Sequence, residues 1–580
     1  MIAPQRTYLQ KLTHLSWFMF IYFCIVLIRL VQLQIVQHEK FEASGKKNFL
    51  RFKIIPAQRG NILDCHGTPL ATNQPITKVI WKGTGNHHLS PQQIESIQTI
   101  YKILQREPIT IQAIKRTEKF SLETVIAENI TQEQLCLIAE QCSDTTNVTF
   151  VTSFNRFYPQ ATVASHLLGY LGDVNICAQG KMGLEKVCEE TLRGDPGILQ
   201  QSTNSFGSLL ESEELKQGSS GEDIFTSIDL NLQAIVENTL ANELEGSCIL
   251  FDPKTGFIKA LVSKPNFDPS IFSTKMDPEQ WQALQQQKVF LNRAFNATYP
   301  PASIFKLVTI AAAIEEKIIT TEARFHCPGY TIFKDRKYYC SRNTGHGTLS
   351  TEESLAHSCN IPFFEIAKKL HIDTLANYAF EFGLGTKTNV PFSEQTGLIP
   401  TNKWKIQTKG ERWWTGETLS ATIGQSFLLV TPIQVACMIG SIFQGYLVKP
   451  RITLQDPLEK RPINIHPSTR HFLQTCMKAA SNAGTARRVN KIGNLTIYAK
   501  TGTAQTKTRR NCDAPTEFHE NREDREHAWF VSYFYTDDTE PLVMVMLLEH
   551  VGRSIYTTKV AKNFFLSYRD YLKKIKAQNK

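Results

Sequence analysis

A serine and a lysine three residues apart are the first candidates for chemistry in this chain of 580 residues. Ser303 and Lys306 lie in the run YPPASIFKLVTIAAAIEEK, residues 299–317. The two prolines suit a helix start, and the residues after Ser303 are mostly apolar, which predicts a buried helix. A spacing of three places both side chains on one side of that helix. A serine hydroxyl becomes a nucleophile when a base takes its proton, and a desolvated lysine can be that base.

Two further motifs follow Ser303 along the chain. They are Ser358-Cys359-Asn360 and Lys500-Thr501-Gly502-Thr503. Such short patterns also arise by chance, and further copies lie at 44–47 (S-x-x-K), 202–204 and 341–343 (S-x-N) and 254–256 (K-T-G). Only one set combines the order S-x-x-K, S-x-N and K-T-G with a suitable helix or strand for each motif. That set is typical of enzymes with a serine nucleophile.

The elements expected around these motifs predict an α/β (α+β) domain over residues 225–580. Strands are expected at 248–262 and at 527–550, each as a hairpin, and at 495–505. Amphipathic helices are expected at 225–242, with a cap near Asp229, and at about 557–575. Five strands with helices before, between and after them indicate a mainly antiparallel sheet flanked by helices.

Residues 37–224 are expected to form a separate spacer and interaction module. A strand-like entry leads to the turn at Asp64-Cys-His-Gly67, and polar helical patterns cover roughly 91–106 and 121–143. No cluster of catalytic residue types precedes residue 225.

An apolar segment at residues 15–36 is long enough to span a bilayer as a helix. Arg6 and Lys11 precede it, which predicts that residues 1–14 are a cytoplasmic tail and that the remainder lies outside the cytoplasm. The alternative is a cleaved signal peptide, but a small-residue cleavage site does not follow Val36, so an uncleaved anchor is favoured.

The composition excludes some classes of function. The net charge of +10 is modest for this length, and no basic tract or nucleic-acid motif accompanies it, so nucleic acid is not an expected partner. The excess of basic residues lies near both ends, which suits a lipid bilayer surface. The thirteen cysteines are scattered and do not form a small disulfide framework, so most are expected to be buried thiols.

The three motifs in this order, with several others, resemble the class B penicillin-binding proteins, which are membrane-anchored peptidoglycan transpeptidases. The module before residue 225 then corresponds to their extended pedestal (dimerisation-type) domain. It carries R-G-x-I-x-D-x-x-G-x-x-L-A at 59–71, R-x-Y-P at 156–159, and G-L-E and L-R-G at 183–185 and 192–194. The segment 410–434 is similar to the elongation-type, PBP2-like branch. The resemblance covers nearly the whole chain.

The resemblance implies a reaction and a role for each motif residue. The substrate would be a peptidoglycan stem peptide ending in D-Ala-D-Ala, with Ser303 attacking the penultimate carbonyl and Lys306 taking its proton. Lys500 would hold Lys306 partly neutral through its positive charge. Ser358 would relay a proton to the leaving amine, and Asn360 would hold the substrate amide.

The late strand would bind the end of the substrate. Thr501 and Thr503, with Gly502 between them, would contact the terminal carboxylate. Backbone N–H groups of Ser303 and Thr503 would form the oxyanion hole. The chemistry requires no cofactor. β-lactams would acylate the same serine, and a membrane-embedded glycan polymerase and other elongation proteins are the partners that the resemblance implies.

Three positions depart from the family pattern. The family usually has Pro-Gly where this chain has Pro301-Ala302, D-R-N-G where it has Asp64-Cys-His-Gly67, and I-G-Q-G where it has Ile423-Gly-Gln-Ser426. None of these changes removes a catalytic group, but the first can alter the backbone near Ser303.

Four residues between 327 and 359 form a candidate metal site. Three thiols and one imidazole suit tetrahedral zinc, although their spacing is not a zinc-finger pattern. The alternatives are a Cys327–Cys340 disulfide or free buried thiols. By resemblance, some elongation-type relatives bind a metal in this region. Because Cys359 lies inside S-x-N, a structural zinc here would brace the active site. The four candidate ligands are Cys327, Cys340, His346 and Cys359.

Other functions stay open beside the elongation-type transpeptidase. A division-type (septal) transpeptidase of the same class would share these motifs, and a D,D-carboxypeptidase side activity or a β-lactamase would use water as the acceptor. A sensor or scaffold without turnover is the alternative that is not an enzyme. A sensor should have several membrane spans, and a scaffold should have lost Ser303, Lys306 or Lys500, whereas all three are present.

Overall fold

The structure is a computed structural model that describes residues 4–42, 50–105, 111–142, 147–172, 178–204, 209–273, 276–506 and 522–578. The chain forms two compact units. The first comprises residues 1–58, 73–155 and 194–221, and the second comprises residues 59–72, 156–193 and 222–580. The predicted domain boundary between residues 224 and 225 stays a prediction. The second S-x-x-K copy, at 44–47, and Cys177 and Cys512 lie outside the described residues.

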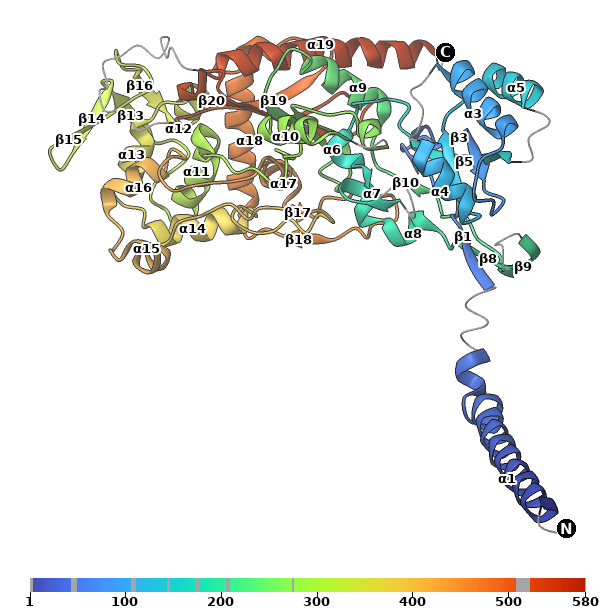
Figure 1. The fold of residues 1–580 in the computed structure, drawn as a ribbon. Coiled ribbons are helices and arrows are strands. Elements are labelled where there is room, and N and C mark those ends of the chain that lie inside the picture. The colour runs from blue at the N-terminus through green and yellow to red at the C-terminus, as the bar shows by residue number, and fades with distance from the viewer. Residues whose placement is uncertain are drawn as a thin grey trace. The chain divides into compact units, whose positions relative to one another are not determined.

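The second unit is built on the predicted five-stranded sheet (Figure 1). Its strand order is β12-β11-β21-β20-β19, and every neighbouring pair is antiparallel. The prediction of two hairpins and a fifth, late strand is therefore confirmed. The strands are β11 Gly246–Phe251, β12 Ile258–Lys264, β19 Thr496–Ala504, β20 His527–Tyr535 and β21 Leu542–Leu548.

Both faces of this sheet are covered by helices, because side chains alternate across a strand and both sets are apolar. On one face, Leu250, Phe530 and Met544 pack with α9 (Leu230–Thr239) and α19 (Ile555–Gln578). On the other face, Ile249, Val531 and Val545 pack in the core that contains α11 (Lys306–Glu315), α17 (Pro432–Gln444) and α18 (Pro467–Asn482). Asp229 caps α9, as predicted, by accepting from the N–H groups of Asn231 and Leu232.

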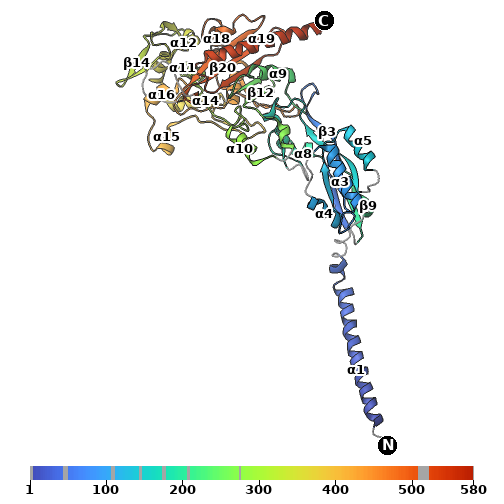
Figure 2. The same ribbon diagram turned by 45° about the horizontal axis from the view of Figure 1, so that its top comes forward.

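The rest of the second unit consists of short elements around this core (Figures 1 and 2). The helices are α6 Ser165–Leu168, α7 Gly183–Val187, α8 Glu189–Arg193, α10 Pro278–Gln286, α12 Thr351–Ala356, α13 Ile361–Ala367, α14 Ile372–Glu381, α15 Asn402–Lys409 and α16 Thr415–Ala421. The strands are β2 Ile62–Leu63, β6 Leu171–Gly172, β7 Gln179–Gly180, β10 Ile224–Phe225, β13 Arg324–Cys327, β14 Tyr330–Phe333, β15 Arg336–Tyr339, β16 Gly347–Ser350, β17 Tyr446–Val448 and β18 Lys460–Pro462.

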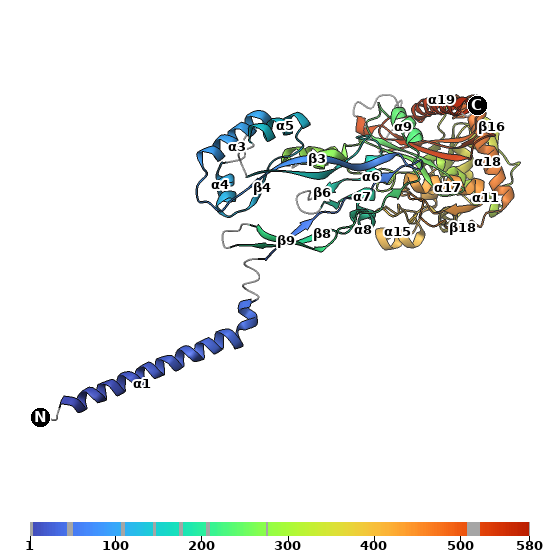
Figure 3. The ribbon, with the colours of Figure 1, turned by 90° about the vertical axis from the view of Figure 1, so that its right-hand side faces the viewer.

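Apart from the N-terminal helix described below, the first unit combines strands with the helices α3, α4 and α5 (Figure 3). Trp81, Ile100 and Ile138 are among the apolar residues of its core, which joins the strands to the helices. Its elements are β1 Leu50–Ile55, β3 Pro69–Lys82 (which begins in the second unit), β4 Glu123–Ala127, β5 Val148–Phe157 (which ends in the second unit), β8 Gly197–Thr203, β9 Leu209–Lys216, α3 Pro91–Leu104, α4 Ile111–Lys119 and α5 Gln132–Gln141.

The predicted helix at 121–143 is wrong in its first half. Residues 123–127 form strand β4, which pairs with β3, and the helix begins only after Thr131. Thr131 and Gln134 form a reciprocal capping box there, which fixes the start of α5. The predicted helix at 91–106 is confirmed as α3, with Ser90 as its cap.

The N-terminal helix α1 spans Pro4–Val31 and continues as a π-helical turn to Val36. Within it, Lys11–Val36 is long and apolar enough to cross a membrane, and most of its apolar side chains are exposed. These properties fit the predicted anchor at residues 15–36.

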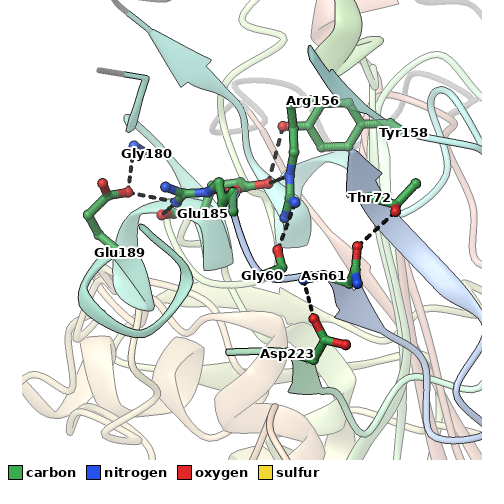
Figure 4. A network of polar contacts seen from close by, with 10 residues as sticks. Gly60, Asn61, Thr72, Arg156, Tyr158, Gly180, Glu185, Glu189 and Asp223 are labelled. Carbon is green, nitrogen blue, oxygen red and sulfur yellow. Dashed lines mark hydrogen bonds and ion pairs between the residues drawn. The ribbon is translucent and has the colours of Figure 1, made fainter. Parts of the chain in front are cut away.

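Two of the motifs of residues 59–194, those with Arg59 and Arg156, meet at the carboxylate of Glu185, which ends the G-L-E motif (Figure 4). Arg59 Nε lies 2.7 Å from one oxygen of Glu185, and Arg156 Nε lies 2.7 Å from the other. A second nitrogen of Arg59 binds Glu189 at 2.6 Å, and Arg156 also donates to the Gly60 carbonyl at 2.7 Å. The Glu185 side chain is fully buried. Arg59, Arg156 and Glu185, one from each of three quoted motifs, therefore form a buried ion-pair network that joins three distant segments.

Candidate active site

Ser303 lies in a short 3-10 turn, Ala302–Ile304, directly before α11, as its position after the two prolines predicts. Its side chain is half-buried, and no hydrogen-bond partner of its hydroxyl is found among the described residues. Ala302 has a φ of 51°, in the left-handed region that favours glycine. The Ala302 N–H donates to the Gly424 carbonyl at 2.8 Å, so the turn is tied to a second loop.

That second loop requires glycine for a steric reason. A Cβ at Gly424 would lie 2.0 Å from the Ala302 carbonyl oxygen. Two residues on, Ser426 has a φ of 72°. The departures from the family pattern at 302 and 426 therefore both place a side chain where the backbone is left-handed.

Lys306 is fully buried at the start of α11, and its ammonium nitrogen points at the S-x-N motif. It lies 2.7 Å from Asn360 Oδ1, 2.9 Å from the Ser358 carbonyl and 3.3 Å from Ser358 Oγ. A fourth contact reaches the Cys359 carbonyl at 3.3 Å. The first and second motifs are therefore brought together by direct hydrogen bonds.

Lys500 brings the third motif to the same hydroxyl. Its ammonium nitrogen lies 3.2 Å from Ser358 Oγ and 2.8 Å from the Thr501 carbonyl, and the side chain is fully buried. Ser358 has a φ of 57°, an uncommon conformation for a serine. Strained backbone of this kind concentrates at functional sites.

Burial is the leading cause of the pKa shifts of both lysines. It lowers the pKa of Lys306 to about 8, while the thiols of Cys340 and Cys359 act in the opposite direction. Burial and then the charge of Lys306 lower the pKa of Lys500. The charge of Lys500 is thus not the main cause of the lowered pKa of Lys306, contrary to expectation. Desolvation alone is enough to populate the neutral amine of Lys306 near neutral pH.

The remaining residues of the late strand lie beside the serine turn. A Cβ at Gly502 would lie 3.3 Å from the Ile304 side chain and 3.4 Å from the Pro301 carbonyl oxygen, so β19 passes close to Ser303. Thr501 Oγ1 donates to Thr485 Oγ1 at 2.7 Å. The hydroxyl of Thr503 accepts from the Ser554 N–H at 3.2 Å.

Some residues at this site lie outside the three motifs. Thr485 binds Thr501, and Gln425 Nε2 lies 3.4 Å from the Thr503 carbonyl. Trp529 Nε1 donates to the Pro300 carbonyl at 3.0 Å, which fixes the approach to the serine turn. Gln425 is the one with a sequence signal, since it lies in the quoted segment 410–434.

The four candidate metal ligands also come together. Each offers one ligand atom, and the four atoms lie within 4.8 Å of one another. His346 Nδ1 lies 3.6 Å from Cys327 Sγ and 3.5 Å from Cys340 Sγ, and Cys340 Sγ lies 3.7 Å from Cys359 Sγ. Tetrahedral zinc, with bonds of about 2.3 Å to sulfur and about 2.1 Å to nitrogen, would separate its ligand atoms by roughly 3.6–3.8 Å. The donor set therefore fits zinc in both chemistry and spacing.

This cluster adjoins the S-x-N motif. The Asn360 N–H donates to Cys340 Sγ at 3.5 Å, and Asn360 Nδ2 donates to the Tyr339 carbonyl at 3.2 Å. The hydrogen bond between Cys340 and Cys359 lowers the pKa of Cys340 and raises that of Cys359. Cys327 and Cys340 are free thiols, so the disulfide alternative is not the arrangement found.

Comparisons with known proteins identify the class. Residues 246–568 match the family described as Penicillin binding protein transpeptidase domain, and residues 54–226 match the Penicillin-binding Protein dimerisation domain. The chain therefore belongs to the penicillin-binding protein transpeptidase family. Because a dimerisation domain precedes the transpeptidase domain, it is a class B penicillin-binding protein, and its relatives place it in the elongation-type, PBP2-like branch.

Three of these relatives show how far the likeness extends. The chain is 26% identical to the peptidoglycan D,D-transpeptidase MrdA of Acinetobacter baumannii, over 94% of this chain and 86% of that protein. It is 26% identical, with a TM-score of 0.74, to a chain in a solved peptidoglycan synthase complex, covering 97% of this chain and 98% of that one. Helicobacter pylori PBP2, solved in complex with MreC, shares the fold at 24% identity and a TM-score of 0.75, over 89% of this chain and 98% of that one.

Proposed function

We propose that this chain is a peptidoglycan D,D-transpeptidase of cell-wall elongation that cross-links stem peptides through an acyl-enzyme on Ser303. The observation that carries the proposal is the buried cluster in which Lys306 and Lys500 both contact Ser358 Oγ. This cluster joins the three motifs beside the serine turn. The activity named for MrdA supports the same reaction.

Acylation begins when Ser303 Oγ attacks the carbonyl of the penultimate D-Ala. The serine proton passes to the neutral amine of Lys306, and the C–N bond to the terminal D-Ala breaks. The leaving amine takes a proton relayed through Ser358, to which both lysines are hydrogen-bonded. The backbone N–H groups of Ser303 and Thr503 stabilise the oxyanion, and Thr501 and Thr503 bind the terminal carboxylate.

Deacylation completes the cross-link. The amine of a second stem peptide attacks the ester and loses a proton to Lys306. The ester C–O bond breaks, and Ser303 Oγ regains a proton as it leaves. Water in place of the amine gives the D,D-carboxypeptidase side reaction. A β-lactam follows the first half of this sequence, with its ring amide as the bond that breaks, so it leaves a stable acyl group on the serine.

Fluorescent penicillin tests this assignment directly. The wild-type chain should be labelled, Ser303→Ala should not, and Ser44→Ala, which changes the serine of the other S-x-x-K match, should be labelled as the wild type is. Equal labelling of Ser303→Ala and the wild type would refute the role of Ser303.

We further propose a single-pass anchor in the bacterial cytoplasmic membrane, with the catalytic unit outside the cytoplasm. The apolar helix Lys11–Val36 supports the anchor, and the basic residues before it favour this orientation.

Elongation proteins, including a membrane-embedded glycan polymerase, are the proposed partners, because relatives are solved with MreC and in a synthase complex. Depletion should give round cells, whereas filaments would indicate a division role.

We also propose a structural zinc ion on Cys327, Cys340, His346 and Cys359. The spacing of the ligand atoms supports it, as does the direct link from Cys340 to Asn360. The metal would supply rigidity to the S-x-N motif and would take no part in the acyl transfer.

A further inference from the structure

The turn at Asp64–Gly67 brings together three metal-ligating side chains that the reaction does not use. We propose that Cys65, His66 and Asp229 form a second zinc site, separate from the cluster beside the S-x-N motif. Each offers one ligand atom, and the three atoms lie within 4.8 Å of one another. Cys65 and His66 follow β2, whereas Asp229 is the cap of α9, so the site joins segments far apart in the sequence.

The distance between the histidine and aspartate ligand atoms agrees with a tetrahedral metal. His66 Nε2 lies 3.4 Å from Asp229 Oδ2. Zinc bound at about 2.0–2.1 Å to a nitrogen and an oxygen would hold those two atoms about 3.3 Å apart. The sulfur of Cys65, on the neighbouring residue, is within reach of the same point.

The backbone of both segments is held in place without the metal. Asp64 Oδ1 accepts from the N–H groups of His66, at 2.9 Å, and Thr68, at 2.7 Å. The Cys65 N–H donates to the Ile228 carbonyl at 2.8 Å, one residue before Asp229. The ligand-bearing residues are thus preorganised, which lowers the entropy cost of binding an ion.

The acidic ligand has an oxygen to spare. Asp229 Oδ1 accepts from Asn231 and Leu232 at the start of α9, which leaves Oδ2 to face the imidazole. The helix cap therefore does not compete with a metal for the same atom.

The donor set selects the ion, and its exposure sets the type of site. One sulfur, one imidazole nitrogen and one carboxylate oxygen favour zinc over magnesium or calcium, which prefer oxygen alone. The His66 side chain is 61% exposed and that of Asp229 is 14% exposed, so an ion can enter from solvent. Three protein ligands leave a fourth position for water, which makes the site exchangeable.

Two of the three ligands depart from the family pattern. Cys65 and His66 stand where that pattern reads Arg-Asn. When bound, the ion would tie the turn after β2 to the first turn of α9, in addition to the existing hydrogen bonds.

Metal analysis of the full chain in detergent tests this inference. The protein is stripped with a chelator, dialysed against zinc and analysed for bound metal, in the wild type and in a His346→Ala background that weakens the other cluster. In each background, Cys65→Ser and His66→Asn should each lower the bound zinc by one equivalent per chain. Cys136→Ser, which removes an exposed cysteine of α5, should leave it unchanged.

Cobalt binding gives a second readout, because a thiolate ligand adds a charge-transfer band to the cobalt spectrum. In the His346→Ala background, that band should disappear with Cys65→Ser and persist with Cys136→Ser. Fluorescent penicillin labelling of each variant that keeps His346 checks that the protein is folded. Unchanged zinc in Cys65→Ser and His66→Asn would overturn the inference, as would an equal loss in Cys136→Ser.

Discussion

Lys306 and Lys500 donate to the same hydroxyl, that of Ser358, at 3.3 and 3.2 Å. Burial disfavours the charged form of both lysines, and the charge of Lys306 further disfavours the charged form of Lys500. In the proposed reaction, these hydrogen bonds would provide the path along which a proton passes between Lys306 and Ser358.

The pH dependence of acylation follows from the lowered pKa of Lys306. A base must be neutral to accept a proton. The pKa of Lys306 is lowered to about 8, and at pH values below it the neutral fraction falls about tenfold per pH unit. The second-order rate constant of acylation by a β-lactam should therefore rise with pH up to about 8 and level off above it. Stopped-flow measurement from about pH 6 to pH 9 checks this, with denaturation monitored in parallel. A flat profile over that range would exclude Lys306 as the titrating base.

Replacing Ser426 by glycine should stabilise the protein. Ser426 is exposed and has a φ of 72°, a conformation that costs a residue with a Cβ about 1 kcal/mol. Ser426→Gly should raise the thermal midpoint of unfolding slightly, whereas the matched Ser420→Gly, inside helix α16, should lower it. Differential scanning calorimetry measures both, and a lower midpoint for Ser426→Gly would contradict the argument.

Glu185→Gln should destabilise the chain strongly. It leaves Arg156 and Arg59 buried with one carboxylate fewer, and breaking a buried ion pair in this way costs roughly 3–5 kcal/mol. The midpoint of chemical denaturation should fall accordingly. Glu190→Gln changes an exposed residue of the neighbouring helix α8 and should behave as the wild type does. Equal midpoints for the two variants would show that the network contributes little.

The proposed structural zinc predicts a matched pair of histidine effects. His346→Ala should lose one zinc per chain and slow acylation by penicillin, because the segment Cys359-Asn360 loses its support. His357→Ala removes a nearby exposed ring outside the cluster and should change neither quantity. Elemental analysis and acylation kinetics provide the two measurements. Wild-type protein without zinc at this cluster would end the proposal.

The catalytic sheet could be predicted because its signals are local. Apolar runs define β11, β20 and β21, and Asp229 announces the start of α9. The three motifs could be ordered into one site only through the family resemblance, since nothing in the spacing of Ser303, Ser358 and Lys500 fixes their contact in space.

The parts that sequence reasoning missed depend on distant partners. Strand β4 is polar on one side and looks like the start of a helix until its pairing with β3 is known. Likewise, Arg59 and Glu185 are 126 residues apart, so neither pattern alone reveals the ion pair. Thr485 is a single polar residue whose role arises only from the position of β19.

The strand that carries Lys500 is the last in the order of its sheet, and β20 is its one partner among the described strands. A border strand exposes main-chain donors and acceptors that an extended peptide can use to add itself to the sheet. Binding of this kind selects a peptide by its strand direction and its extended conformation, because the hydrogen bonds go to main-chain atoms. Hydrogen bonds to residues 500–504 would thus fix the register of the bound peptide. A shift of one residue would move the scissile bond away from Ser303.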